Sequence, residues 1–440
     1  MRTITTNKIW ALAWPLILSN ISIPLLGLVD TAVLGHLPDP QFLASVAIGS
    51  AIIAFVYWAF GFLRMGTTGV TAQAYGSQNT RLVGVIFFRA CTLALIICSI
   101  VVLLHPWLFQ FGLWAMNTDT TINALADQYL NIRLISAPAA LLNYVAVGWL
   151  IGVQRPKTAL LVVVICNTLN ILLDLILVVG LDMTSAGVAW ATVIAEYTAC
   201  IIAVIIITKH IDVKIDFPFL RQIFNVHSLT KLASGNGYLF VRTVALLMTM
   251  AFFTKKGAEF GVITLAANAL LMQLAMVVSY ALDGFANAAE ALVGEAVGNN
   301  DTEKLYSAMK GTAYASIIVG VLFSIFIGLF QGPLIALLTS QAEVMDAASI
   351  YYPYIIIFPI VAVWSFWLDG VFIGANRNAE MMWSMLFASG IVFSGLLFTF
   401  QTLLNTGLWL AYLGFIAARG VSLGYISYRY TKRNAWFKSS

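Results

Sequence analysis

The chain contains the stretch Gly148-Trp-Leu-Ile-Gly-Val-Gln-Arg155 and, in its second half, the stretch Gly370-Val-Phe-Ile-Gly-Ala-Asn-Arg377. Both follow the pattern G-x-x-I-G-x-x-R and lie at a constant offset of 222 residues, from Gly148 to Gly370. At the same offset, without a gap, Leu43, Ala44, Ala47, Ala74, Gly76 and Tyr129 coincide with Leu265, Ala266, Ala269, Ala296, Gly298 and Tyr351. One offset maintained over so long a stretch predicts an internal duplication.

The composition places the duplicated unit in a membrane. Of the 440 residues 61% are hydrophobic and only 10% are charged, and the mean hydropathy is +0.91. Soluble domains have about 25% charged residues. The apolar runs lack the alternating pattern of membrane barrel strands, so we expect an all-α, polytopic membrane protein.

Twelve apolar runs are long enough to cross a bilayer, which takes about 20 helical residues. We predict spans near residues 9–34, 42–72, 82–106, 123–151, 157–180, 186–208, 230–254, 262–292, 304–330, 344–374, 380–403 and 407–429. Each half has an even number of spans, so the two six-helix lobes enter the membrane in the same orientation and form a parallel repeat.

The predicted domains follow from this division. Residues 1–208 form an N-lobe, residues 209–229 a polar cytoplasmic linker and residues 230–440 a C-lobe. Two parallel six-helix halves are typical of transporters in which the lobes rock around a central cleft to give alternating access.

The basic residues give the orientation. Apart from Lys255 and Lys256, the loops with Lys and Arg all lie on one side of the predicted membrane, the side of both termini. The positive-inside rule therefore predicts cytoplasmic N- and C-termini in the cell (inner) membrane. The net charge of +4 is thus orientation information, and no nucleic-acid partner is implied.

Polar residues recur at helical spacing inside the span 157–180. Asn167, Asn170 and Asp174 are three and four residues apart, which puts them on one face of a helix. A carboxylate at membrane depth costs at least a few kcal/mol, so it normally faces a cavity or a partner and marks an ion or substrate path.

Two other spans bring polar residues to the same depth. Counted along the spans, Asp30, Asp174 and Thr192 all lie within roughly 6–9 Å of the same outer boundary. Glu196 is one turn deeper than Thr192. Two close carboxylates either share a proton or hold a cation, and oxygens of Asp30, Asn170, Asp174 and Thr192 would also suit Na⁺. The residues alone do not separate these alternatives.

The acidic cluster has no counterpart in the second half, where Val392 and Leu396 stand at the positions of Asn170 and Asp174. We therefore expect one lobe to couple the ion. Pro15 and Pro24 each remove a backbone hydrogen bond from the helix that carries Asp30, and so predict a bend in it.

Other intramembrane charges lie in the second half. Arg242 lies in the middle of its span, and Asp283 and Asp369 lie in the inner parts of theirs. An Arg–Asp pair would reduce the cost of burying these charges, so a structural pair is the preferred interpretation. The cysteines, Cys91, Cys98, Cys166 and Cys200, have no metal-ligand spacing and are expected to fill the core.

The stretch Pro24-Leu-Leu-Gly-Leu-Val-Asp30-Thr-Ala-Val-Leu-Gly-His36 resembles the first helix of the DinF-like branch of the multidrug and toxic compound extrusion (MATE) transporters. Thr71-Ala-Gln-Ala-Tyr-Gly76 is similar to the end of that branch's second helix. The resemblance covers essentially the whole chain. It implies export of amphipathic, often cationic compounds in exchange for H⁺ or Na⁺. We expect a monomer with no cofactor other than the coupling ion.

By the same resemblance, Asp30, Asn170, Asp174 and Thr192 fall on the family's N-lobe cation or proton site, and Pro15 on the proline at which helix 1 bends. One feature departs from the related NorM-like branch, which has a glutamate in helix 7. Residues 230–254 contain no acid, although Asp369 resembles that branch's acid in helix 10. This departure favours proton coupling in the N-lobe.

Three other functions are weaker. A flippase for lipid-linked oligosaccharides shares the superfamily's frame, but such proteins commonly need a basic cleft, whereas the first lobe offers acids. An intramembrane enzyme is disfavoured because the sequence has no H-E-x-x-H, G-x-S-x-G or paired catalytic motif. A passive channel gives no reason for an acidic pair in one lobe.

Overall fold

The computed structural model describes residues 6–35, 39–116, 119–211 and 216–437. They form helices and turns, with no strand among them. Ten helical segments of these residues are long and apolar enough to cross a membrane, and the bent pair α5–α6 makes an eleventh. The first predicted span, residues 9–34, lies within helix α1 (Thr6–Gly35). The all-α fold with two lobes is therefore confirmed.

Two compact units make up the chain. The N-unit comprises Leu18–Ser234, and the C-unit comprises Met1–Ile17 with Gly235–Ser440. The predicted lobes have their boundaries between spans. The boundaries of the two units instead fall inside helix α1 and inside helix α10 (Val226–Glu259). Of the predicted linker, residues 212–215 lie outside the described part, and α9 (Phe217–Ile223) follows them.

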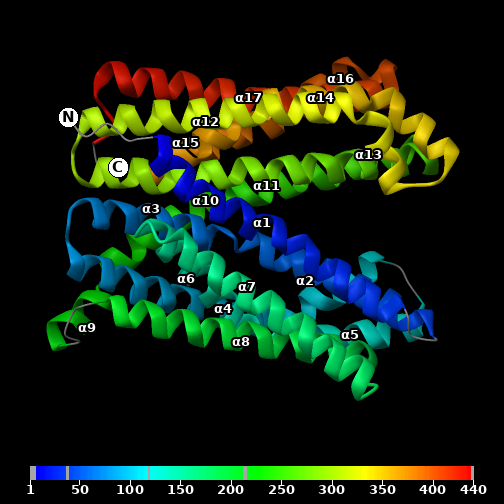
Figure 1. Cartoon of the computed structure of the whole chain (residues 1–440), viewed down its shortest axis with the longest axis horizontal. Coiled ribbons are helices and arrows are strands. Elements are labelled where there is room, and N and C mark those ends of the chain that lie inside the picture. Colours follow the sequence, from blue (N-terminus) through cyan, green and yellow to red (C-terminus); the bar gives the residue numbers. More distant parts are fainter. Residues whose placement is uncertain (1–5, 36–38, 117–118, 212–215, 438–440) are drawn as a thin grey trace. The chain divides into compact units, whose positions relative to one another are not determined.

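The N-unit is a bundle of helices in which α6, α7 and α8 lie beside one another (Figure 1). Its helices are α2 (Pro40–Ala59), α3 (Phe62–Gly76), α4 (Thr80–Met116), α5 (Thr120–Ile135), α6 (Ala137–Gly152), α7 (Pro156–Asp174) and α8 (Thr184–His210). A π-helix, η1 (Leu175–Gly180), continues α7.

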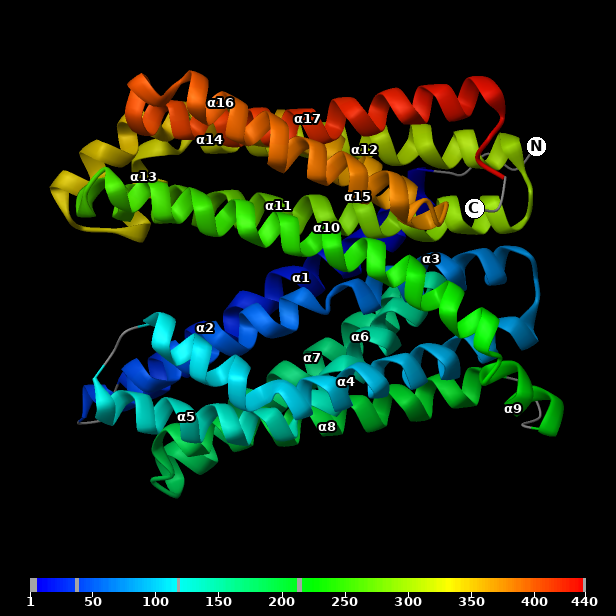
Figure 2. The ribbon, with the colours of Figure 1, turned by 180° about the vertical axis from the view of Figure 1, so that it is seen from behind.

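The C-unit packs its longest helices, α11 and α14, against each other, and α12 and α17 both pack on α14 (Figure 2). Its further elements are α11 (Val262–Gly298), α12 (Thr302–Leu329), α13 (Gln331–Leu338), α14 (Ala342–Gly374), α15 (Asn378–Leu386), η2 (Phe387–Phe393), α16 (Ser394–Thr399), η3 (Gln401–Leu403) and α17 (Leu404–Arg433). Buried rings of Trp409, Tyr412 and Phe415 on α17 form the centre of its core.

The repeated glycine motif marks one close helix crossing in each unit. A Cβ on Gly148 of α6 would lie 2.4 Å from the Arg64 carbonyl oxygen of α3, and one on Gly370 of α14 would lie 2.3 Å from the Ala286 carbonyl oxygen of α11. Only glycine permits such an approach. One turn further on, Gly152 meets Thr68 at 2.9 Å and Gly374 meets Glu290 at 2.6 Å. The four contacts form two pairs that keep the offset of 222 residues, so the internal repeat is confirmed at the level of backbone packing.

Two spans are less regular than expected. The predicted span 42–72 breaks into α2 and α3 at Phe60–Gly61. The predicted span 123–151 bends by 51° between α5 and α6, at Ser136. Pro138 lies two residues later, in the first turn of α6, where the helix needs no backbone N–H donor.

Candidate functional site

Two carboxyl groups meet inside the N-unit. The side chains of Asp30, on α1, and Asp174, the last residue of α7, are hydrogen-bonded to each other. Asp174 is fully buried. The Oδ1 atoms of both residues are buried and have no hydrogen-bond partner. A bond between two carboxyl groups needs a proton on one of them, so this geometry suits a pair that holds one proton.

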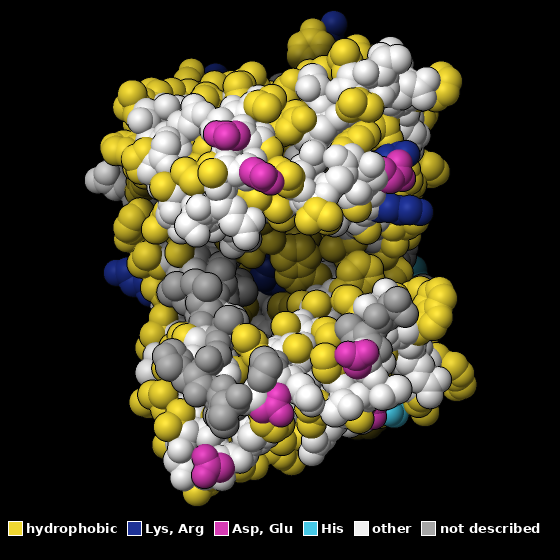
Figure 3. Space-filling model, turned by 90° about the vertical axis from the view of Figure 1, so that its right-hand side faces the viewer, with side chains coloured by type: hydrophobic (Ala, Val, Ile, Leu, Met, Phe, Trp, Pro, Cys, Tyr) yellow, Lys and Arg dark blue, Asp and Glu magenta, His cyan; other side chains and the backbone are white. Residues whose placement is uncertain are grey.

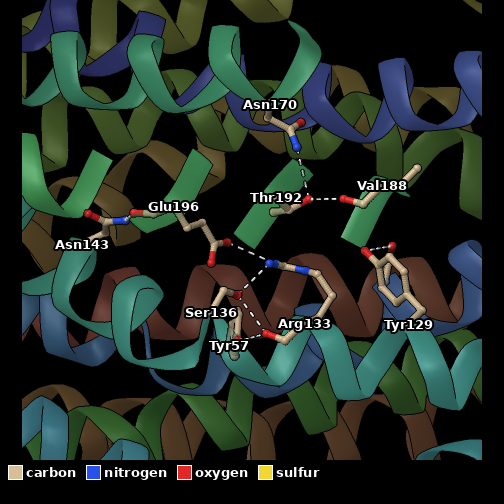
Figure 4. Close-up of polar contacts among 10 residues, drawn as sticks. Tyr57, Tyr129, Arg133, Ser136, Asn143, Asn170, Val188, Thr192 and Glu196 are labelled. Atoms are coloured by element: carbon tan, nitrogen blue, oxygen red, sulfur yellow. Dashed lines mark hydrogen bonds and ion pairs between the residues drawn. The ribbon is translucent and has the colours of Figure 1, made fainter. Parts of the chain in front are cut away.

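Asn170 extends the pair toward α8. The Asn170 Nδ2 donates to Thr192 Oγ1 at 3.1 Å, and that hydroxyl donates to the Val188 carbonyl at 3.0 Å (Figure 4). With the amide turned over, Nδ2 donates to Asp174 Oδ2 at 3.3 Å and the amide oxygen accepts from the Thr192 backbone N–H at 3.2 Å. In this orientation both the nitrogen and the oxygen of the Asn170 amide have hydrogen-bond partners, so we adopt it. Amide orientations are assigned from such networks. The structure thus brings the four predicted residues, Asp30, Asn170, Asp174 and Thr192, together.

Local backbone structure places Asp174 at a change of helix type. Helix α7 ends at Asp174, and the π-helix η1 begins at the next residue. Short π-helical segments occur frequently at functional sites, because the wider turn alters the direction of side chains around it. The sequence analysis did not predict this change.

Asn167, predicted two turns deeper than Asp174 on the same face, joins α7 to α1. Its Nδ2 donates to Ser22 Oγ at 3.0 Å and to the Ser22 carbonyl at 3.2 Å. Asn167 therefore lies on the stripe as predicted, and its hydrogen bonds go to the side chain and backbone of Ser22, on the helix that carries Asp30.

A buried ion pair, which the sequence analysis missed, lies next to the stripe. Arg133 Nη2 bonds to Glu196 Oε1 at 3.1 Å, and Arg133 Nη1 donates to Ser136 Oγ at 2.7 Å (Figure 4). The Arg133 side chain is only 8% exposed. Its charge also attracts the carboxylate of Asp30. A single arginine within a predicted span requires a partner, and that signal could have identified it.

Tyr129 lies one turn before Arg133 on α5. Its hydroxyl is 3.1 Å from Ser50 Oγ of α2, and its ring fills the space beside Gly49, where a Cβ would lie 2.5 Å from Tyr129 Cδ1. Tyr129 therefore fixes α5 on α2, which holds Arg133 beside the stripe.

The C-unit contains the predicted pair of Arg242 with Asp369, and a second arginine joins it. Arg242 and Arg419 both donate through Nη2 to Asp369 Oδ2, Arg419 at 2.6 Å. All three side chains are less than 10% exposed. Two guanidinium groups on one carboxylate leave a net positive charge, which would repel a bound cation.

The predicted bend residues lie in α1. Pro15 is buried within an uninterrupted helix. Pro24 belongs to the same helix, but its side chain is outside the described part of the structure. The bend itself stays a prediction.

The four residues of the carboxyl cluster also provide oxygens for a small cation. The two unpaired Oδ1 atoms, the Asn170 amide and the Thr192 hydroxyl are the hard ligands that Na⁺ accepts. Among the described residues, no group of three His, Cys, Asp or Glu side chains could hold a metal ion. The cysteines that the structure describes are free thiols.

Comparison with known proteins gives a consistent result. A model of the MatE family matches residues 15–176 and 240–398. The chain is 39% identical over 439 residues to the DNA damage-inducible protein F of Escherichia coli (strain K12), which covers 100% of this chain and 95% of the relative. It is 25% identical over 427 residues to Protein DETOXIFICATION 44, chloroplastic, of Arabidopsis thaliana, covering 94% of this chain and 81% of the relative.

Solved structures share the fold. One is described as the outward-facing conformation of a multidrug resistance MATE family transporter of the MOP superfamily. It aligns with a TM-score of 0.83 at 19% sequence identity and covers 99% of this chain and 97% of its own.

Proposed function

Because the chain belongs to the MatE family of membrane transporters, we propose that it is an antiporter that exports amphipathic, mostly cationic organic compounds in exchange for protons. The hydrogen bond between Asp30 and Asp174 is the observation that carries the proposal. The names of the relatives support export of toxic compounds and drugs, since they refer to detoxification and multidrug resistance.

The proton acts at the carboxyl pair. With one proton bound, Asp30 and Asp174 are joined, and α1 is tied to α7 both there and at the Asn167–Ser22 bond. Without the proton, two buried carboxylates repel each other, and the nearby Arg133 charge competes for Asp30. Proton release therefore favours displacement of α1, and this displacement is the step that couples the ion to the substrate.

A change in α1 can reach both lobes because α1 belongs to both compact units, through Ile17 in one and from Leu18 in the other. Pro15 stands close to this division and lacks the N–H donor of a regular helix. Bending at Pro15 is the proposed link between protonation of the N-unit and alternating access of the two lobes.

Proton coupling is favoured over sodium coupling by the C-unit. Asp369 is neutralised by Arg242 and Arg419, so the acid that resembles a NorM-type ligand is engaged in ion pairs. In the N-unit, the direct carboxyl–carboxyl bond requires a proton on one of the two groups, whereas a bound sodium ion would require both to be ionised.

The proposed orientation has both termini in the cytoplasm of the cell (inner) membrane. Figure 3 shows one end of the helices of each unit, taken by itself. There, Asp and Glu side chains stand among uncharged ones, and Lys and Arg side chains appear mainly at the margins. A surface poor in basic groups agrees with an outer face under the positive-inside rule.

Reconstitution into liposomes tests the function. The purified protein is assayed with a fluorescent organic cation under an imposed proton gradient and, separately, under an imposed Na⁺ gradient. We expect the proton gradient alone to drive accumulation. Transport driven by the Na⁺ gradient alone would show that sodium, and not the proton, is the coupling ion. Transport that responds to neither gradient would exclude coupled export.

A further inference from the structure

A groove runs along the C-unit between α14 and α17. Its volume is about 690 Å³, and apolar and aromatic side chains such as Trp364, Leu368 and Val421 line most of it. The groove does not involve the carboxyl cluster, which lies in the N-unit.

Two glycines of α17 form the floor of the groove. A Cβ on Gly420 would lie 3.1 Å from Trp364 Cβ, whereas a Cβ on Gly424 would meet only Leu368 Cδ1, at an ordinary 3.8 Å. The helix surface is therefore hollowed at Gly424 by the missing side chain, and a larger residue there can be placed only in the groove.

The groove opens on a surface suited to lipid. Val421, Tyr428 and Trp364 are 72%, 64% and 46% exposed, and both helices are candidate membrane spans. From Ala417 to Thr431 the groove is about 20 Å long at 1.5 Å per residue. That length matches one leaflet, because half of the hydrocarbon core is about 15 Å and a headgroup region follows.

One end of the groove is polar and basic. Thr431 lines this end, and its carbonyl accepts from the Tyr306 hydroxyl of α12 at 3.3 Å. Lys432 follows Thr431, and Lys310 lies one turn after Tyr306 on the same face of α12. Both lysines are exposed and make no ion pair within the part of the chain that the structure describes.

Other charges near this end do not cancel the two amines. Glu303, one turn before Tyr306, is the acidic residue on that face of α12. Glu380 is bonded to Tyr430, and its charge is balanced by the Arg377 guanidinium, which lies 5.2 Å from the centre of the Tyr430 ring. Glu295 is paired with Lys304 and Lys8. Arg433 adds positive charge to the last turn of α17, on the face opposite the groove. The polar end of the groove is therefore net basic.

We propose that this groove holds one acyl chain of an anionic phospholipid, with its phosphate beside Lys310 and Lys432. The apolar channel fits the chain, and the two amines complement the headgroup charge. With the termini in the cytoplasm, the lipid comes from the cytoplasmic leaflet, where the basic turn of α17 meets the anionic surface.

Native mass spectrometry of the full-length protein in detergent tests the site. Phosphatidylglycerol, phosphatidylcholine and inorganic phosphate are titrated separately. We expect phosphatidylglycerol to be retained in preference to phosphatidylcholine, and inorganic phosphate to neither bind nor compete. Lys310→Gln and Lys432→Gln should each weaken phosphatidylglycerol binding about fivefold, the effect of one basic residue near an anionic headgroup.

Two further variants distinguish the groove from general surface charge. Gly424→Leu should remove the retained phosphatidylglycerol by filling the channel, and Arg433→Gln should leave its binding unchanged because Arg433 lies on the other face. If Gly424→Leu does not fold, Gly424→Ala serves in its place with a smaller loss. Unchanged binding in the groove variants, an equal loss in Arg433→Gln, or equal retention of phosphatidylcholine would overturn the proposal, and competition by inorganic phosphate would show a free-anion site instead.

Discussion

The carboxyl groups of Asp30 and Asp174 are hydrogen-bonded to each other, although the residues lie on the first and seventh helices of the chain. The bond can exist only while one of the two groups is protonated. Rising pH must therefore break it, and falling pH must restore it. This relationship makes the state of α1 dependent on a single proton.

An amide at residue 174 should uncouple the protein from pH. Asp174→Asn can still donate to Asp30, so the contact persists without a titrating proton. We expect proton-driven uptake in liposomes to fall to that of protein-free liposomes. Binding of a fluorescent organic cation to the detergent-solubilised variant should become independent of pH, whereas the wild type should change its affinity with pH.

Asp369→Asn, measured on its folded fraction, is the control, because it changes a buried aspartate outside the N-unit. It should keep the pH-dependent binding of the wild type. Loss of that dependence in Asp369→Asn but not in Asp174→Asn would place the coupling proton in the C-unit.

The pair of Arg133 and Glu196 should matter for stability. Glu196→Gln leaves a buried guanidinium without its carboxylate, which costs about 3–5 kcal/mol of unfolding free energy for buried pairs. Thermal unfolding in detergent should show a large drop for Glu196→Gln. The double variant Arg133→Met with Glu196→Leu should recover most of it, since no unpaired charge remains. A single variant as stable as the wild type would contradict the importance of this pair.

Substitutions in the cluster of Arg242, Arg419 and Asp369 should change the stability of the protein. Arg242→Met leaves a one-to-one pair of Arg419 with Asp369, so we expect a small change in stability. Asp369→Asn leaves two guanidinium groups facing each other and should cost about 3–5 kcal/mol. Both can be measured by chemical unfolding in micelles. A stabilising effect of added Na⁺ that disappears in Asp369→Asn would instead indicate a cation site.

The glycine crossings should tolerate no side chain. Gly148→Ala and Gly370→Ala press a methyl group against a carbonyl oxygen at 2.4 and 2.3 Å, and overpacking of this kind costs about 1–3 kcal/mol. Gly237→Ala is the control, because a Cβ on this helical glycine meets nothing within 4 Å. It should raise the melting temperature slightly, in line with a helix propensity gain of up to ~1 kcal/mol.

Features with a local sequence signal were predicted well. The glycine motif gave the repeat, and the stripe Asn170/Asp174 with Asp30 and Thr192 gave a group of residues that do meet. The helical face and the depth of a residue depend only on its position along its own span. Counting residues was therefore sufficient to predict which polar side chains meet.

Features that depend on another helix were missed. Arg133 and Glu196 are 63 residues apart and lie on α5 and α8, and Arg419 reaches Asp369 from a third helix of its unit. The breaks at Ser136 and at Phe60–Gly61 lie inside segments that we predicted as single spans, and hydropathy gives no boundary at either place. The π-helix after Asp174 depends on packing around that turn, and no residue type marks it.

The left-handed turns of the repeat suggest a route to a sturdier protein. Gln78 and Asn300, and likewise Gln154 and Asn376, occupy equivalent positions with φ of 56°, 52°, 58° and 55°. Asparagine adopts this conformation more readily than glutamine. The second copy thus serves as a template for improving the first. Gln78→Asn and Gln154→Asn are substitutions by which an engineer could prolong the lifetime of the purified protein without touching either polar cluster.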